Sequence, residues 1–227
     1  MQRLAIYRPL RSSRISQKFG ESKACIYPSG KVVGKRDNVC PLGSEDFYKS
    51  IGMKSHNGID WPGIKGEAIV HGGMYDGWMR TETDMAGGIG VDVVSKEKVR
   101  LEDGTETYIK CRYWHLSTPI GWNGKEVKHG QIIGLCGNTG ASSGTHLHFG
   151  VKPCDKEGNS LDKWNGYYGA IDPTPYLRNG AFAGDSLNLQ GIGAVYPTQK
   201  ERQQMIDQLG AARYIFLEMR EMIYKYV

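Results

Sequence analysis

Two histidines near residue 146 give the strongest chemical signal in the chain. In the stretch SGTHLHFG, His146 and His148 alternate with Leu147 and Phe149. Because side chains in a strand alternate between its two faces, the two imidazoles are expected to project together while Leu147 and Phe149 turn into apolar packing. Two neutral imidazoles side by side suit a borderline-soft metal ion such as zinc.

One pair of histidines is not a complete site, but the chain offers further ligands. His56 and Asp60 stand in SHNGIDW, and His115 stands in YWHL. A catalytic zinc site usually has three protein ligands and an open position for water, whereas a structural site is closed by four. The chain therefore has more than enough ligands for a catalytic metal, with histidine left over for proton transfer.

These motifs, in this order, resemble those of the lysostaphin-type (LytM-like) peptidoglycan metalloendopeptidases. The family pattern appears as His56-Asn-Gly-Ile-Asp60, Tyr113-Trp-His115-Leu and His146-Leu-His148. The flanks are similar too, with RISQKFG near residue 14 as an opening strand and DPTPYL as a closing segment. The resemblance covers roughly residues 1–178, and three motifs in order are far more specific than a lone H-x-H.

The resemblance implies one zinc ion held by His56, Asp60 and His148. It places His115 and His146 beside the metal as catalytic residues that handle protons or hydrogen-bond the developing oxyanion. The implied activity is endopeptidase cleavage of stem or cross-bridge peptides of bacterial peptidoglycan. The alternative is a catalytically inactive cell-wall-binding or virion-structural module with the same fold; such relatives typically lack one or more ligands, and this chain retains all five motif residues.

The sequence around these residues predicts mainly β-structure. Glycine is frequent, with 31 residues, and short alternating segments run from His56 to Lys152. We expect a small antiparallel sheet lining a metal groove, as in the lysostaphin-type, duplicated-hybrid-motif-like fold. Residues 21–55 form a long polar insertion, which is expected to be either a wall of the groove or a surface loop. His71 and His129 lie outside the motifs and are expected to be packed or surface residues.

The chain changes character after the expected peptidase domain at 1–178. Residues 179–197 are glycine-rich without periodicity and predict a linker. Residues 198–227 predict an amphipathic C-terminal helix, which either packs on its own domain or mediates self-association or docking to a larger assembly. Its apolar stripe recurs at spacings of four and three: Met205, Leu209, Ala212, Phe216, Met219, Ile223 and Tyr226.

Composition limits the partners and the location. The formal charge of +5 and the pI near 8.8 are compatible with an ordinary solvated surface or with attraction to a polyanionic wall. There is no interleaved aromatic and basic patch typical of nucleic-acid binding, and no apolar run approaches the roughly 18 residues of a membrane span. No secretory signal is seen, so we expect a protein that acts at the bacterial cell wall after delivery by a phage virion or release at lysis.

Five cysteines are present, with no C-x-x-C spacing. Cys111 and Cys136 lie in apolar segments and are expected to be buried. Cys25 and Cys40 flank a loop containing glycine and lysine and could form a disulfide after export, whereas synthesis without a signal favours reduced thiols. The sequence leaves both states open.

Overall fold

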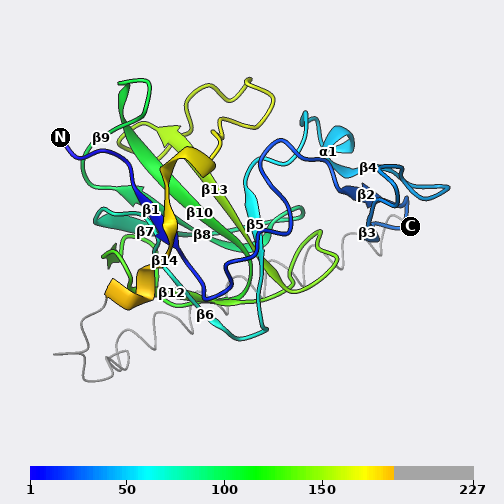
Figure 1. Cartoon of the computed structure of the whole chain (residues 1–227), viewed down its shortest axis with the longest axis horizontal. Coiled ribbons are helices and arrows are strands. Elements are labelled where there is room, and N and C mark those ends of the chain that lie inside the picture. Colours follow the sequence, from blue (N-terminus) through cyan, green and yellow to red (C-terminus); the bar gives the residue numbers. More distant parts are fainter. Residues whose placement is uncertain (187–227) are drawn as a thin grey trace, which may run out of the picture.

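The computed structural model describes residues 1–186, which fold mainly as β-structure (Figure 1). The described part holds one short α-helix, α1 (Phe47–Ser50), and two 3₁₀ turns, η1 (Thr174–Tyr176) and η2 (Ala183–Ser186). The mainly β fold expected from the sequence is confirmed. The predicted C-terminal helix at 198–227 lies outside the described residues. No helix within residues 1–186 is long and apolar enough to cross a membrane.

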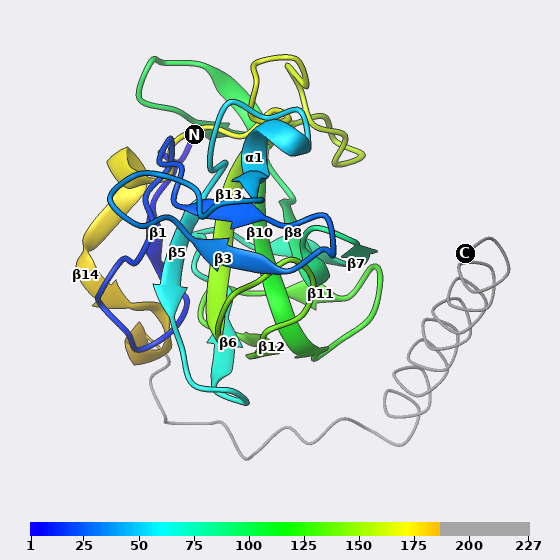
Figure 2. The same cartoon turned by 90° about the vertical axis from the view of Figure 1, so that its right-hand side faces the viewer.

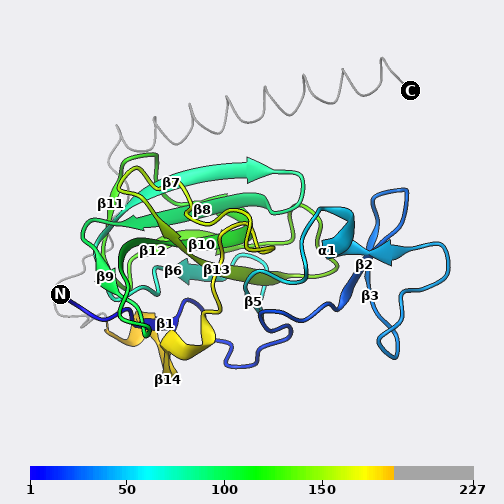
Figure 3. The ribbon, with the colours of Figure 1, turned by 90° about the horizontal axis from the view of Figure 1, so that it is seen from above.

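A large sheet of nine strands forms the body of the described chain. Its members are β5 (Ile59–Pro62), β6 (Ala68–Val70), β7 (Gly77–Asp84), β8 (Gly88–Ser95), β9 (Val99–Arg100), β10 (Glu106–Pro119), β11 (Glu126–Val127), β12 (Ile132–Cys136) and β13 (His146–Cys154). The long strand β10 lies at the centre, antiparallel to β8 on one side and to β13 on the other. Strand β5 extends the sheet beyond β13. The layered arrangement is clearest in Figure 3.

The two faces of β10 have different chemistry because its side chains alternate. Ile109, Cys111 and Tyr113 point into the core and are fully buried, whereas Lys110 and Arg112 lie on the opposite face with partial exposure. The core face packs against aliphatic and aromatic side chains of neighbouring strands, including Ile59, Trp61, Val91, Val93, Ile133, Leu147 and Phe149. One face of the sheet is thus committed to the core, which leaves the other to form the floor of a groove.

A parallel pair of strands at the edge closes the body. Strand β1 (Ile6–Arg8) pairs with β14 (Leu177–Phe182), and the two lie side by side in Figure 1. Phe182 is 9% exposed and packs with Val70, while Ala183 is fully buried. The chain therefore remains in the fold through the first residues of the segment expected to be a linker at 179–197. Residues 187–197 of that segment lie outside the described part.

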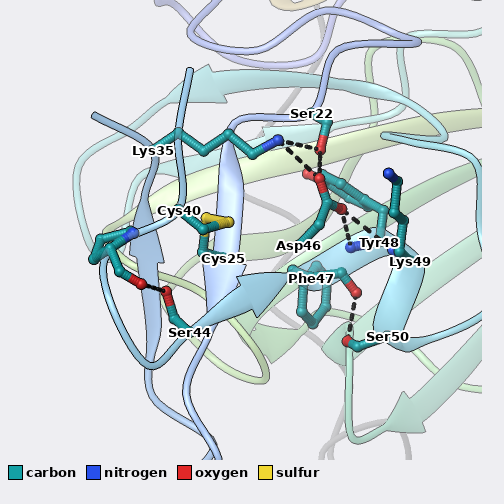
Figure 4. The surroundings of a disulfide bond; sticks show 11 residues. Ser22, Cys25, Lys35, Cys40, Ser44, Asp46, Phe47, Tyr48, Lys49 and Ser50 are labelled. Carbon is teal, nitrogen blue, oxygen red and sulfur yellow. Dashed lines mark hydrogen bonds and ion pairs between the residues drawn. A yellow bond between two sulfur atoms is a disulfide. The ribbon is translucent and has the colours of Figure 1, made fainter. Parts of the chain in front are cut away.

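The insertion at 21–55 is a small folded unit instead of a structureless loop. Strands β2 (Ala24–Ile26), β3 (Val32–Gly34) and β4 (Glu45–Asp46) form a separate three-stranded sheet, and α1 follows directly. Asp46 caps α1, because its side chain accepts hydrogen bonds from the backbone of Tyr48 and Lys49, and it also pairs with Lys35 (Figure 4). The Cys25–Cys40 disulfide, which the sequence left open, links β2 to the segment after β3.

Candidate metal centre

Three donor atoms converge at one edge of the groove. The Nε2 atom of His56 lies 2.8 Å from Nδ1 of His148 and 3.0 Å from Oδ1 of Asp60. The Nδ1 atom of His148 lies 3.1 Å from the same Asp60 oxygen. The structure therefore brings together the three residues that the sequence predicted as ligands.

Backbone pairing explains how these residues meet. Asp60 on β5 and His148 on β13 are directly opposite each other in the antiparallel ladder, so their side chains share one face. His56 precedes β5 and is fixed by its Nδ1 atom, which donates a hydrogen bond to the carbonyl of Lys18 at 3.0 Å. That bond selects the tautomer with a lone pair on Nε2, the atom that faces Asp60 and His148.

A glycine makes room for the His148 ring. A Cβ atom at Gly58 would lie 2.4 Å from the carbonyl oxygen of Phe149 and 2.7 Å from Cε1 of His148. Both distances are shorter than real Cβ contacts allow, so any larger side chain here would displace the His148 ring or the backbone behind it. The Gly in SHNGIDW therefore leaves the space that the His148 ring occupies.

The donor set fits a divalent metal ion. In a tetrahedral site with metal–nitrogen distances of about 2.0–2.1 Å, neighbouring ligand atoms lie roughly 3.3 Å apart, close to the separations seen here. Burial alone would raise the pKa of the Asp60 carboxyl, but His56 and His148 hold it well below its ordinary value, so the carboxylate is ionised. Two imidazole nitrogens and one carboxylate oxygen leave a fourth position for another ligand.

His115 lies beside this group on an irregular part of β10. The pairing of β10 with β8 shifts register between Tyr113 and Leu116, and His115 adopts a left-handed φ of 64°. Its Nδ1 atom donates to the carbonyl of Thr139 at 2.7 Å, which leaves Nε2 as an acceptor. Burial, with a smaller contribution from His146, lowers the His115 pKa to about 3, so the ring is neutral at pH 7.

His146 packs against His115 with its ring tilted and reaches toward the same three residues. The two ring centroids are 4.5 Å apart. The Nδ1 atom of His146 donates to the carbonyl of Gly144 at 2.8 Å, and its Nε2 atom lies 3.7 Å from Oδ2 of Asp60. The glycine-rich turn before β13 thus sets the orientation of this ring, with Nε2 directed at the metal group.

All five motif histidine and aspartate residues line one cavity, and the insertion forms a wall of it. From the insertion come Ala24, Val32, Phe47, Tyr48, Ile51 and Met53. Ala86 and Ala141, from the turns before β8 and β13, pack against the same apolar cluster. Figure 2 looks onto this side, where α1, β2 and β3 lie in front of β10 and β13. Of the two roles considered for residues 21–55, the structure shows the groove wall.

Several cavity residues were missed from the sequence, among them Phe47, Tyr48, Arg112 and Trp114. Phe47 and Tyr48 belong to the insertion, whose fold has no counterpart in the family pattern. Arg112 and Trp114 on β10 could have been predicted from the sequence, because strand alternation in CRYW places both on the face opposite Tyr113.

The two histidines outside the motifs are packed elsewhere, as expected. His71 is fully buried, with Nδ1 2.8 Å from the Tyr113 hydroxyl and Nε2 3.1 Å from the Tyr75 carbonyl. His129 lies 3.0 Å from the Gly73 carbonyl through Nδ1. Neither lines the cavity. The tyrosine of the YWHL motif is thereby explained as a core residue that holds His71 and the Gly72 backbone.

The region that holds these residues is similar to a known protein family. Residues 54–163, close to half of the chain, match the model of Peptidase family M23. The matched region contains all five cavity residues of the three motifs.

Parts of the chain are also similar to named relatives and to a solved structure. The chain is 30% identical over 138 residues to the glycyl-glycine endopeptidase ALE-1 of Staphylococcus capitis, covering 59% of this chain and 32% of that protein. It is 53% identical over 43 residues to the peptidoglycan DD-endopeptidase ShyA of Vibrio cholerae, covering 19% and 10%. The solved structure of LytU is 25% identical with a TM-score of 0.46, covering 73% of this chain and 85% of LytU. The chain thus spans no more than about a third of the length of the curated relatives it matches.

Proposed function

We propose that the chain is a zinc-dependent endopeptidase that hydrolyses peptide bonds in the stem or cross-bridge peptides of bacterial peptidoglycan. One observation carries the proposal: the His56–Asp60–His148 group opens onto a groove that two further histidines also line. The match of residues 54–163 to Peptidase family M23 supports metallopeptidase chemistry, and the names of the relatives support peptidoglycan as the substrate. The site of action would then be the bacterial cell wall.

In this proposal His56, Asp60 and His148 hold one zinc ion. Their single carboxylate offsets only part of the two positive charges. The chemistry that such an ion supplies when bound is Lewis acidity toward a peptide carbonyl and toward a water molecule. The fixed tautomer of His56 and the cross-strand pairing of Asp60 with His148 keep the donor atoms in place before the metal arrives.

His115 and His146 would act as the catalytic residues. Each ring uses Nδ1 to donate to a backbone carbonyl, so each presents Nε2 to the cavity. A neutral imidazole with Nε2 free can accept a proton from water, and the protonated form can donate to the leaving nitrogen or to a developing oxyanion. Two such rings side by side allow one to accept a proton while the other donates.

The experiment that tests this function measures metal and product together. The purified full chain should contain about one zinc ion per molecule by mass spectrometry and should release soluble peptides from purified sacculi. Chelation should abolish release, and added zinc should restore it. A zinc-loaded protein that binds sacculi without releasing peptides would contradict the proposal and would fit the non-hydrolytic wall-binding module instead.

A further inference from the structure

A cationic side chain lies in the floor of the groove near the candidate metal group of His56, Asp60 and His148. Arg112 stands on the groove face of β10 and lines the same cavity as His56, Asp60 and His148. Its direct partner in the ladder is Gly150 on β13. A Cβ atom at Gly150 would lie 3.8 Å from Cβ of Arg112 and 3.8 Å from Nε2 of His148. The absence of a side chain at Gly150 therefore leaves a gap that both Arg112 and His148 border.

The guanidinium of Arg112 is held from one side. Its Nε atom donates to both carboxylate oxygens of Asp92, at 3.0 and 3.2 Å, and Asp92 is almost fully buried. The guanidinium carbon lies 4.5 Å from the ring centroid of Trp114. Trp114 is in turn confined by Gly87 and Gly90, where any Cβ atom would collide with the indole ring. The arginine is thus pre-organised, and little conformational freedom remains to be lost on binding.

The two terminal nitrogens of Arg112 are available for a ligand. Within residues 1–186 they make no hydrogen bond, and the side chain is 21% exposed. These nitrogens form the end of a planar fork that matches the two oxygens of a carboxylate. Only the Nε atom of Arg112 contacts Asp92, so the two terminal nitrogens are not needed for that structural contact.

The surrounding charge also favours an anion. The Nζ atom of Lys110 also lies 3.5 Å from Oδ2 of Asp92. Lys152 is buried on β13, on the same face of that strand as Gly150. Burial lowers the pKa of Lys152 to about 7, and the positive charges of Arg112 and Lys110 lower it in the same direction, against the smaller opposing effect of Asp92 and Asp84. Asp84, on the cavity rim, is the one acidic residue besides Asp60 that lines the cavity among the described residues.

We propose that Arg112 is a specificity-determining residue that binds a substrate carboxylate close to the scissile bond. The substrate class would be an acidic peptide, with a free carboxyl group next to the cleaved linkage instead of a carboxamide. This inference rests on the proposed endopeptidase function and deepens it, since it names which peptides the groove prefers.

The test uses two synthetic stem peptides that differ in one group beside the cleaved bond, a free carboxyl in one and a carboxamide in the other. The zinc-loaded full chain should cleave the acid with a kcat/KM about 10–100-fold higher, the range expected for a bidentate charge-assisted contact. Arg112→Gln should lose this preference, because kcat/KM should fall for the acidic peptide alone. Arg112→Lys should retain part of the preference. Equal cleavage of both peptides by the unmodified chain would overturn the inference.

A matched control separates local binding from general charge. Lys110→Gln removes the same charge beside Asp92 from a residue that does not line the cavity, and it should keep the preference for the acid. If kcat/KM fell equally for both peptides in Arg112→Gln, Arg112 would only support the fold, and this result would also overturn the inference.

Calorimetric binding decides the inference independently of turnover. If the zinc-loaded chain cleaves neither peptide, the proposed function fails, but tighter binding of the acid than of the amide would still support the carboxylate site. Equal affinity for the two, or no binding of either, would exclude it.

Discussion

The Nε2 atom of His56 and the Nδ1 atom of His148 lie 2.8 Å apart, each at the edge of a ring that is packed in place. Two imidazole lone pairs at this separation repel each other unless a proton or a metal ion lies between them. Asp60 contributes a carboxylate oxygen at a similar distance from both nitrogen atoms. The three atoms together are therefore suited to hold a cation. The first prediction follows from this relationship.

Each ligand substitution should remove the metal. His56→Ala, Asp60→Ala and His148→Ala each delete one of three donors, and we expect severe loss of bound zinc and of hydrolysis. Zinc content after dialysis against a weak chelator gives the direct readout. Near-stoichiometric zinc in His148→Ala would contradict the ligand assignment.

The two remaining site histidines should behave differently. His115→Ala and His146→Ala should retain zinc, while kcat falls by about 10²–10⁴-fold, because proton transfer and oxyanion contacts act mainly in the transition state. His129→Ala is the suitable control. His71 is not, because it is fully buried with two hydrogen bonds, and its removal would lower stability by itself. Loss of zinc in His146→Ala would make that residue a ligand.

Gly58→Ala should damage the metal centre without removing any ligand. The added methyl group would meet the Phe149 carbonyl and the His148 ring, so the ring must shift. We expect zinc affinity to fall by at least about tenfold, the scale of losing support around a ligand. Gly144→Ala, where a Cβ atom would meet nothing within 4 Å, is the matched control. Unchanged zinc affinity in Gly58→Ala would show that the strand can relax around it.

Loss of the disulfide should loosen the groove wall and leave the metal in place. The Cys25–Cys40 bond joins residues 15 apart, and closing a loop of this length stabilises a fold by about 3 kcal/mol. Cys25→Ser with Cys40→Ser should therefore expose the insertion to limited proteolysis and raise KM, with zinc content unchanged. Resistance of residues 21–55 to protease in this variant would contradict a wall that depends on the bond.

Truncation tests the proposed division of the chain. Deleting 198–227 should leave zinc binding and thermal stability intact. Ending the chain at 178 should instead lower Tm strongly, since it removes most of β14 and the buried Phe182, a loss on the scale of about 3–5 kcal/mol. If the shorter deletion already prevents folding, the C-terminal segment belongs to the domain and the proposed linker is wrong.

The sequence predicted which residues meet at the candidate site better than it predicted their surroundings. His146 and His148 were readable because strand alternation places them on one face, and motif order added His56, Asp60 and His115. Arg112 and Trp114 follow from the same alternation, but only once β10 is known to border the groove. Register is not encoded in any single strand, so the opposition of His148 and Asp60 had to come from the structure.

The insertion could not be predicted for a different reason. Its three short strands have two or three residues each, too few for a period to emerge from the sequence. Its stability depends on contacts between segments distant in sequence, such as the Cys25–Cys40 bond and the Lys35–Asp46 pair. The boundary at 178 failed to anticipate β14 because that strand is held by pairing with β1, far away in sequence.

The two ends of the insertion meet at His56, the first residue of the candidate metal group. The backbone of Gly20 donates to the carbonyl of His56, and the backbone of His56 donates to the carbonyl of Glu21. The chain thus leaves and re-enters at one hydrogen-bonded pair, which anchors the backbone of His56 at both ends of the insertion. The same junction marks where one groove wall could be replaced by another, provided that the new segment keeps a contact like that of Tyr48 with the His56 ring.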